Sequence, residues 1–137
     1  MTRPFTGGCA CGALRYEITA EPSMAFACQC RQCQHDSGTG HASILNFPRA
    51  EAVVHGDATR WSEVGDLGTV KTHAFCPTCG SKVFTTFPDL PDFFAVRAAS
   101  LDDPSRFQPT MVLWTASAQP WDRIDPELTA FEKMPPR

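Results

Sequence analysis

The sequence lacks the features that would place it in a membrane, in a secretory route or on nucleic acid. No apolar run approaches the roughly 18 consecutive residues of a membrane-spanning helix, so we expect no membrane partner. Residues 1–8 contain no hydrophobic signal-peptide segment, which predicts a cytoplasmic protein. The net charge is −3 and the basic residues are scattered, whereas phosphate binding usually needs a basic face. We therefore expect no nucleic-acid partner.

Long helical periodicity is also missing. Twelve prolines and nine glycines divide the chain into short segments. Apolar and polar residues alternate in several of these segments, and others are short apolar runs, which are both patterns of β-strands. The strands predicted in this way are residues 14–18, 24–27, 41–47, 52–55, 59–62, 70–75, 82–87, 93–97 and 111–114.

Turn signals connect these strands. A turn is expected at residues 7–8, which are both glycine. Segments 52–55 and 59–62 flank a glycine–aspartate pair at residues 56–57, which predicts a β-hairpin. Residues 34–38 predict one helical turn closed by glycine. The strand at 70–75 and the strand at 82–87 are expected to form a second hairpin with two cysteines at its tip.

The domain organisation follows from the absence of any repeat, linker or second domain. We predict one domain over residues 1–137, with an all-β fold and at most one or two short helical turns. A domain of this length buries roughly two thirds of the surface that its unfolded chain exposes, so its core does not need cysteines as staples. The proline-rich tail from Gln119 onward is expected to be ordered by the docking of Trp121 and Phe131.

The seven cysteines need a different explanation, because they fall into three tight clusters. An odd number of cysteines argues against a closed disulfide framework, as does the expected reducing compartment. Crowded thiols oxidise, and crowded thiolates repel one another. A soft divalent cation removes both problems, because it deprotonates the thiols and neutralises their charge. The clusters therefore indicate metal or redox chemistry.

Two cysteine pairs are suited to one closed metal site. Cys9 and Cys11 belong to one turn, Cys76 and Cys79 belong to another, and each pair is followed directly by a glycine that permits a positive φ. Two such pairs are the usual source of a tetrahedral Zn(Cys)₄ site. We predict a structural zinc ion here, with a binding free energy on the order of 10 kcal/mol or more, comparable with the stability of a whole domain.

The alternative for the pair at Cys76 and Cys79 is a redox motif with two intervening residues. That chemistry places the first cysteine at a helix N-terminus, which lowers its pKa. Here Gly80 and a strand-like segment follow the pair, so the sequence offers no helix for this function.

The third cluster, Cys28, Cys30 and Cys33, contains three thiols. Three thiolates fill three corners of a tetrahedron and leave the fourth to water or substrate, which is the coordination of catalytic zinc. Two alternatives stay open at this point. A histidine, with His35 and His41 the nearest candidates, would close the site. Otherwise a substrate thiol would occupy the fourth position and be held as thiolate near neutral pH, against a free pKa of about 8.5.

Other chemistry-bearing residues give no second pattern. His55 and His73 lie in strand-like segments and are expected to be ordinary surface or partly buried side chains. The sequence shows no Ser-His-Asp set, no glycine-rich phosphate loop and no paired carboxylates at an informative spacing.

The order of the cysteine motifs resembles the glutathione-dependent formaldehyde-activating enzyme family, which is shared with centromere protein V. The resemblance covers nearly the whole chain. It is carried by the motifs Gly8-Cys9-Ala10-Cys11-Gly12-Ala13-Leu14-Arg15-Tyr16, Cys28-x-Cys30-x-x-Cys33 followed by Ser37-Gly38, and Phe75-Cys76-x-x-Cys79-Gly80, and by the C-terminal residues Leu101-Asp102-Asp103-Pro104, Phe107, Pro109, Trp114-Thr115 and Pro120-Trp121.

The resemblance implies a β-tent fold of small twisted antiparallel sheets with two zinc ions per chain. By position, the two cysteine pairs match the family's structural zinc ligands, and Cys28, Cys30 and Cys33 match its catalytic zinc ligands. The named reaction joins formaldehyde to the thiol of glutathione and is classed with the carbon–sulfur lyases. Gln29 and Gln34 depart from the histidine and arginine found in many members. Without that histidine or arginine, the site would lack an acid/base or a carboxylate-binding group.

The sequence thus predicts a zinc-dependent carbon–sulfur lyase-like enzyme that acts on a thiol adduct of a small molecule, with glutathione as the expected thiol. The competing prediction is a zinc-stabilised binding or scaffold protein without catalytic activity. A chromatin-binding function, suggested by the centromere relative, is disfavoured by the acidic charge balance. A monomer or a homodimer is expected.

Overall fold

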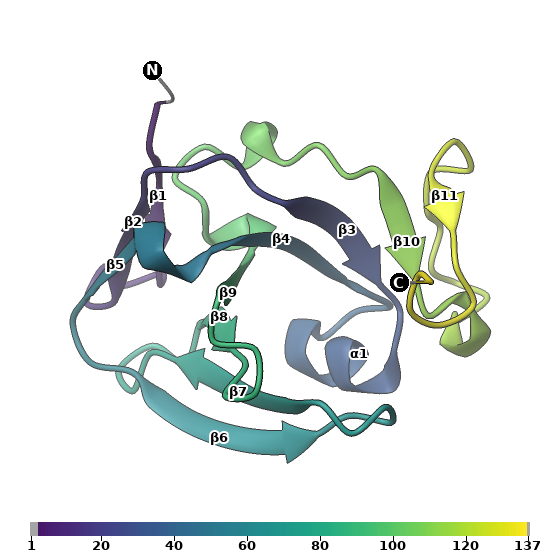
Figure 1. Cartoon of the computed structure of the whole chain (residues 1–137), viewed down its shortest axis with the longest axis horizontal. Helices are drawn as coiled ribbons and strands as arrows, with labels where there is room; N and C mark the ends of the chain where they lie inside the picture. The colour runs from purple at the N-terminus through teal and green to yellow at the C-terminus, as the bar shows by residue number, and fades with distance from the viewer. Residues whose placement is uncertain (1–2, 137) are drawn as a thin grey trace.

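The computed structural model describes residues 3–136, so the ends of the predicted domain, residues 1–2 and 137, lie outside the described residues. Two sheets organise the chain (Figure 1). Three strands in the order β1-β2-β5 form a small antiparallel sheet. Eight strands in the order β11-β10-β3-β4-β9-β8-β7-β6 form the larger sheet.

The strands are β1 Phe5–Gly8, β2 Arg15–Ile18, β3 Met24–Cys28, β4 Ala42–Pro48, β5 Ala52–His55, β6 Thr59–Val64, β7 Val70–Phe75, β8 Lys82–Thr86, β9 Phe93–Arg97, β10 Met111–Leu113 and β11 Thr129–Ala130. The α-helix α1 spans Arg31–Ser37, and four single-turn 3₁₀ helices span Arg49–Glu51, Ala98–Ser100, Pro104–Arg106 and Thr115–Ser117. No helix of the described chain is both long enough and apolar enough to cross a membrane.

Apolar side chains cover both faces of the larger sheet. On one face, Phe47, Phe84 and Phe94 pack with Tyr16 and Ile18 of the small sheet into the main core. The opposite face carries a second cluster around Cys28, Cys33, Ile44 and Leu113, and Figure 1 shows α1 on this side, between β4 and β7. A strand buried on both faces reads as a continuous apolar run, which explains the sequence of β9.

The all-β prediction with one short helix is confirmed, and the predicted strands lie within about two residues of the observed ones. The helix begins earlier than expected, because Cys30 is its N-cap and accepts the backbone N–H of Cys33. Gly38 ends it in the left-handed conformation, with φ 74°, as the sequence indicated. The larger sheet is not purely antiparallel, since β10 pairs in parallel with both β3 and β11.

The predicted hairpin of residues 52–55 and 59–62 is wrong. β5 pairs with β2 in the small sheet, whereas β6 pairs with β7 at the edge of the larger sheet. The turn at Gly56, with φ 94°, therefore carries the chain from one sheet to the other. A glycine turn between two strand-like segments indicates a change of direction, and it does not determine which strand each segment will pair with.

The turn expected at residues 7–8 is also wrong, because both glycines belong to β1 and pair with β2. A β-carbon at Gly7 would lie 2.3 Å from the backbone oxygen of Ser100 and 2.4 Å from the hydroxyl of Tyr16. Glycine is used here for a close approach between β1 and the segment after β9, and the turn follows at Cys9.

Candidate metal centres

The four-thiol cluster, Cys9, Cys11, Cys76 and Cys79, lies where the two sheets meet. Cys9 follows β1 of the small sheet, while Cys76 and Cys79 form the tip of the β7–β8 hairpin of the larger sheet. The two glycines that follow the pairs have positive φ, as predicted, with 83° at residue 12 and 76° at residue 80. The cluster therefore links segments that are far apart in the sequence.

The sulfur positions of this cluster fit a tetrahedral metal ion. All four lie within 4.8 Å of one another, with 3.6 Å between Cys9 and Cys11 and 3.7 Å between Cys11 and Cys76. Sulfur atoms at ~2.3 Å from a tetrahedral zinc ion lie about 3.8 Å from one another. Both the spacing and the soft thiolate donors are therefore compatible with zinc.

Hydrogen bonds favour ionised sulfur at two of the four thiols, Cys9 and Cys79. At Cys11 the largest effect, a hydrogen bond with the Ala13 backbone, lowers the pKa, but the interactions with Cys9 and Cys76 outweigh it and raise the pKa to about 11. The backbone N–H of Leu14 donates to the sulfur of Cys9 at 3.2 Å and lowers the pKa of that thiol. The hydroxyl of Ser81 lies 3.3 Å from the sulfur of Cys79, and this hydrogen bond, together with the Ser81 backbone, lowers the pKa of Cys79 to about 5. Thiolate is the form that binds metal, so the hairpin tip is prepared for coordination.

The three-thiol cluster, Cys28, Cys30 and Cys33, lies where β3 leads into α1. Cys28 ends β3, Cys30 caps α1 and Cys33 lies in its first turn, so a strand end and a helix start present three sulfurs to one point. Their ligand atoms lie within 4.8 Å of one another. Cys28 and Cys33 are buried, and Cys30 is the one that is partly accessible.

The three thiols differ in their pKa values. Hydrogen bonds from Cys28 and Cys33 lower the pKa of Cys30 to about 2, with a smaller contribution from the charge of Lys71. The pKa of Cys28 is raised to about 11, first by its hydrogen bond with Cys30, and that of Cys33 is raised by the same interactions and by burial. One thiol ionises readily and two resist. A divalent cation is what would allow all three to act as thiolates together.

Neither histidine considered as a fourth ligand joins the three thiols. Among the residues that the structure describes, the group contains no histidine and no carboxylate. His35 is exposed on α1. His41 uses its Nδ1 on the carboxylate of Asp122, at 2.9 Å and 3.0 Å from the two oxygens. The geometry thus favours the alternative in which the fourth position is not filled by a protein histidine.

Gln29 and Gln34, the two departures from the family pattern, attach the C-terminal tail to this cluster. Gln29 donates to the buried carboxylate of Asp122 at 3.0 Å. Gln34 donates to the backbone oxygens of Gln29 at 2.8 Å and of Ser117 at 3.0 Å, and accepts from Gln119 at 3.1 Å. Both glutamines are nearly fully buried. Their function in this chain is thus to bind the tail.

Phe131 packs against the second cluster as predicted, but the docking predicted for Trp121 is wrong, since 62% of this residue is exposed. The polar contacts of Asp122 and Ser117 hold this part of the tail instead. An aromatic residue in a polar tail suggests docking because its burial is favourable. A carboxylate such as Asp122, which is held by Gln29 and His41, gives no such signal in the sequence.

Replacing Gln34 by Ala is expected to release the tail. The change leaves the backbone oxygens of Gln29 and Ser117 without their donor, at a cost of about 1–3 kcal/mol. Hydrogen exchange of residues 115–122 should become faster. Gln32→Ala is the matched control, because Gln32 lies on the same helix and donates instead to Asp36. Equal protection of the tail in both variants would contradict this function of Gln34.

A buried charge network that sequence reasoning missed lies beside α1. His73, expected to be ordinary, is only 2% exposed, and its Nδ1 lies 2.6 Å from the Nζ of Lys82. Burial and the charge of Lys82 lower the pKa of His73, so its ring is neutral and its Nε2–H donates to Glu63 at 3.3 Å. Lys82 and Arg97 both donate to one oxygen of Asp36, at 3.0 Å and 2.8 Å.

Sequence patterns indicated this charge network only weakly. Asp36 lies one helical turn after Cys33, and strand alternation would have placed His73 on one face of β7. Neither pattern reveals that the helix packs against that face. His55, by contrast, is exposed as expected.

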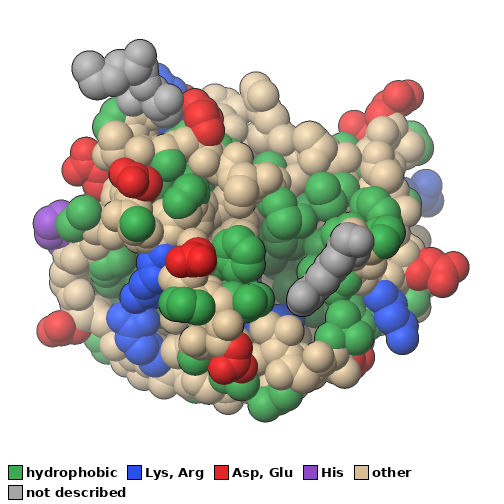
Figure 2. Space-filling model, viewed as in Figure 1, with side chains coloured by type: hydrophobic (Ala, Val, Ile, Leu, Met, Phe, Trp, Pro, Cys, Tyr) green, Lys and Arg blue, Asp and Glu red, His purple; other side chains and the backbone are tan. Residues whose placement is uncertain are grey.

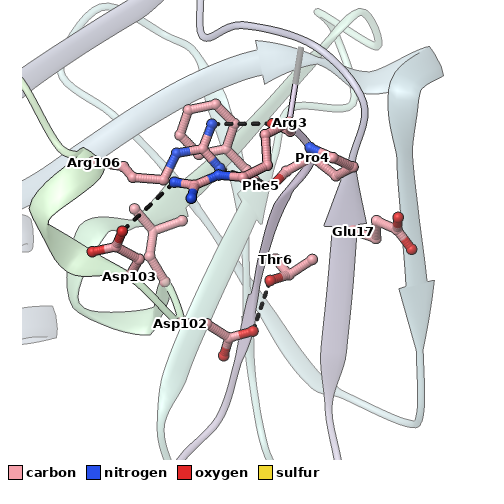
Figure 3. Close-up of a pocket in the computed structure, with 9 residues that line it drawn as sticks. Arg3, Pro4, Phe5, Thr6, Glu17, Asp102, Asp103 and Arg106 are labelled. Carbon is pink, nitrogen blue, oxygen red and sulfur yellow. Dashed lines mark hydrogen bonds and ion pairs between the residues drawn. The ribbon is translucent and has the colours of Figure 1, made fainter. Parts of the chain in front are cut away.

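A pocket of about 340 Å³ at the start of β1 contains none of the cysteines in its lining (Figure 3). The guanidinium of Arg106 lies 3.4 Å from the centre of the Phe5 ring and donates to the backbone oxygens of Arg3 and Pro4. Thr6 donates to Asp102 at 2.7 Å. These contacts hold the segment after β9 against β1, so the residues that line the pocket have a structural role.

The fold and the two clusters define a class of protein: a small β-protein whose cysteines, grouped as four and three, could hold two metal ions. All seven cysteines are free and belong to these two groups.

The chain belongs to the family described as glutathione-dependent formaldehyde-activating enzyme, whose profile matches residues 4–117. A crystal structure of a Rhodobacter sphaeroides protein has the same fold, with a TM-score of 0.56 and 19% sequence identity over 92% of this chain and 98% of that one. No curated protein matches the chain.

Proposed function

We propose that the protein is a zinc-dependent, carbon–sulfur lyase-like enzyme that acts on the adduct of a thiol, such as glutathione, with formaldehyde or a related small molecule. The family supports a function related to glutathione and formaldehyde. The proposal assigns a structural zinc ion to Cys9, Cys11, Cys76 and Cys79, and a catalytic zinc ion to Cys28, Cys30 and Cys33. It concerns a single domain that comprises the whole chain.

One observation carries the proposal: within the described chain the three-thiol cluster includes no histidine or carboxylate among its mutually close ligand atoms, and one of its thiols, Cys30, is partly accessible. A zinc ion bound there would act as a Lewis acid that keeps a substrate thiol ionised near neutral pH. Structural sites are closed by four protein ligands, so three ligands favour catalysis.

The surroundings of the cluster suit a reaction between a thiolate and a small aldehyde. Phe26, Phe87 and Met111 pack at the edge of the second core cluster, which limits the access of water. Figure 2 shows a hollow bordered by hydrophobic side chains, close to where Figure 1 draws α1 beneath β4. Holding the two reactants in such a space favours the reaction mainly through proximity and orientation.

The chain's own residues supply the positioning. Cys28 and Cys33 are buried and fixed by β3 and α1, so they hold their sulfurs in place. The charge of Lys71 favours the ionised form of Cys30 and would equally favour an anionic thiolate beside it. Gln29 and Gln34 are occupied by the tail, so in this proposal neither transfers a proton or binds a substrate carboxylate.

The test is a thiol titration of the zinc-loaded protein, with glutathione and other cellular thiols, followed by NMR detection of adduct formation after formaldehyde is added. We expect one thiol to bind at the three-thiol cluster and adduct exchange to be faster than in protein-free buffer. A zinc-stabilised scaffold protein would bind metal and leave both the thiol and the rate of adduct exchange unaffected. That outcome would overturn the proposal.

A further inference from the structure

A second pocket, separate from the three-thiol cluster, is lined by three cationic side chains. It has a volume of about 430 Å³ and lies between the four-thiol turn and the segment that follows β9. Its cations are Arg15, Lys82 and Arg97, and its one carboxylate is Asp102.

The cations of this pocket outnumber the carboxylates that contact them directly. Arg15 and Asp102 neutralise each other, since both terminal nitrogens of Arg15 donate to the two oxygens of Asp102. Lys82 and Arg97 remain, and they share a single oxygen of Asp36. The other oxygen of Asp36 accepts from Gln32 at 3.1 Å. One carboxylate therefore serves two cations directly, and the next carboxylate, Glu63, reaches Lys82 only through the ring of His73.

Hydrogen-bond donors are left over as well. The Nε of Arg97 is buried and has no hydrogen-bond partner among residues 3–136, and the whole side chain is only 10% exposed. Lys82 has three protons, of which His73 and Asp36 take two. Burial and the charge of Arg97 lower the pKa of Lys82 to about 8, although Asp36 acts in the opposite direction. A buried donor without a partner is costly, so an acceptor at this place would be stabilising.

We propose that this pocket binds a small oxyanion, a carboxylate or a phosphate group, through Arg97 and Lys82. Planar guanidinium donors match the oxygens of both groups, and the ammonium adds a point charge. The proposal does not depend on catalysis at the three-thiol cluster. Two sources of the group fit the chemistry: a carboxylate of a peptide thiol such as glutathione, or free phosphate.

The rival explanation is that these cations only balance the thiolates of the four-thiol cluster, because Cys9 lines the same pocket. In that case the cations would already be satisfied in the zinc-loaded protein, and an added anion would find no free donor. The two explanations thus differ in whether an anion binds to the loaded protein.

The experiment follows the Nε–H signal of Arg97 by NMR in the zinc-loaded full chain while inorganic phosphate or S-methylglutathione is added. S-methylglutathione carries carboxylates but has no free thiol, so its binding reports on the pocket rather than on a thiol site. We expect a saturating shift of this signal. A tighter response to S-methylglutathione would assign the pocket to a peptide carboxylate, and a tighter response to phosphate would assign it to the free ion.

The test variant is Ala99→Glu. Ala99 lines the pocket, is exposed and does not belong to the charge network. The added carboxylate should occupy the site and weaken the affinity for either probe by about tenfold. Ala50→Glu adds the same charge at an exposed position outside the pocket and should change the affinity by no more than about twofold. Absence of a saturating shift in the unmodified protein, or equal weakening by the two variants, would overturn the proposal.

Discussion

The Cys76→Ser variant is expected to lose its cooperative fold. Structural zinc binds with on the order of 10 kcal/mol, and a domain has a free energy of unfolding of only about 5–15 kcal/mol. Removing one of four ligands therefore weakens an interaction whose full strength is comparable with the total stability. The expected readouts are aggregation or a loss of the thermal transition in circular dichroism. Chelation of the unmodified protein should produce the same result.

Cys76 is also fully buried in the main core, so its replacement by a polar residue would be damaging even without a metal ion. Cys79→Ser separates the two causes, because Cys79 is exposed and contributes little to packing. If the metal site stabilises the fold, Cys79→Ser should be nearly as damaging as Cys76→Ser. A cooperative transition close to that of the unmodified protein in Cys79→Ser would contradict a structural metal site.

The Cys30→Ser variant is expected to fold normally and to lose its thiol ligand. Serine is a good N-cap, so its hydroxyl should replace the sulfur as acceptor for the backbone N–H of Cys33 and keep α1 intact. The three-thiol cluster keeps only two thiols. Loss of a partner that merely orients a metal ligand costs about 10–100-fold in activity, so loss of a ligand should cost more than about 100-fold.

Three measurements check this expectation: the thermal transition, the zinc content and the rate of adduct exchange. The zinc content should fall from two ions per chain to one, since the four-thiol cluster is untouched. Gln32→Ala, on the same helix, should keep both ions and the full rate. If Cys30→Ser damaged the fold as severely as Cys76→Ser, the assignment of one structural and one catalytic cluster would be wrong.

Cysteine spacing predicted the grouping of the seven thiols because metal-ligand spacing is a local property of the chain. The pairs at residues 9 and 11 and at residues 76 and 79 each come from one turn, and the structure brings them together. Most strands were predicted for a similar reason, since alternation and short apolar runs are local patterns.

What the sequence did not predict depends on which segments meet. The pairing of β5 with β2 needed knowledge of a distant partner, and a glycine turn suggested a local one instead. The His73 network arises only because α1 packs against β7 and β8. Gln29 and Gln34 stand where many members have a histidine and an arginine, so the sequence pointed only to lost groups. Their observed partners, Asp122 and Ser117, lie more than 80 residues away.

The attachment of the tail by Gln29 and Gln34 has a consequence for how the protein opens. Gln29, His41 and the backbone of Gly40 all lie against the carboxylate of Asp122. Separating the tail from these segments on either side of α1 leaves Gln29 and His41 without their acceptor at once, so we expect the tail and these segments to open together. These segments flank Cys28, Cys30 and Cys33, whereas sulfurs of the four-thiol cluster are hydrogen-bonded to Leu14 and Ser81 instead. We therefore expect the two cysteine clusters to open separately, and a metal ion to exchange at different rates in each.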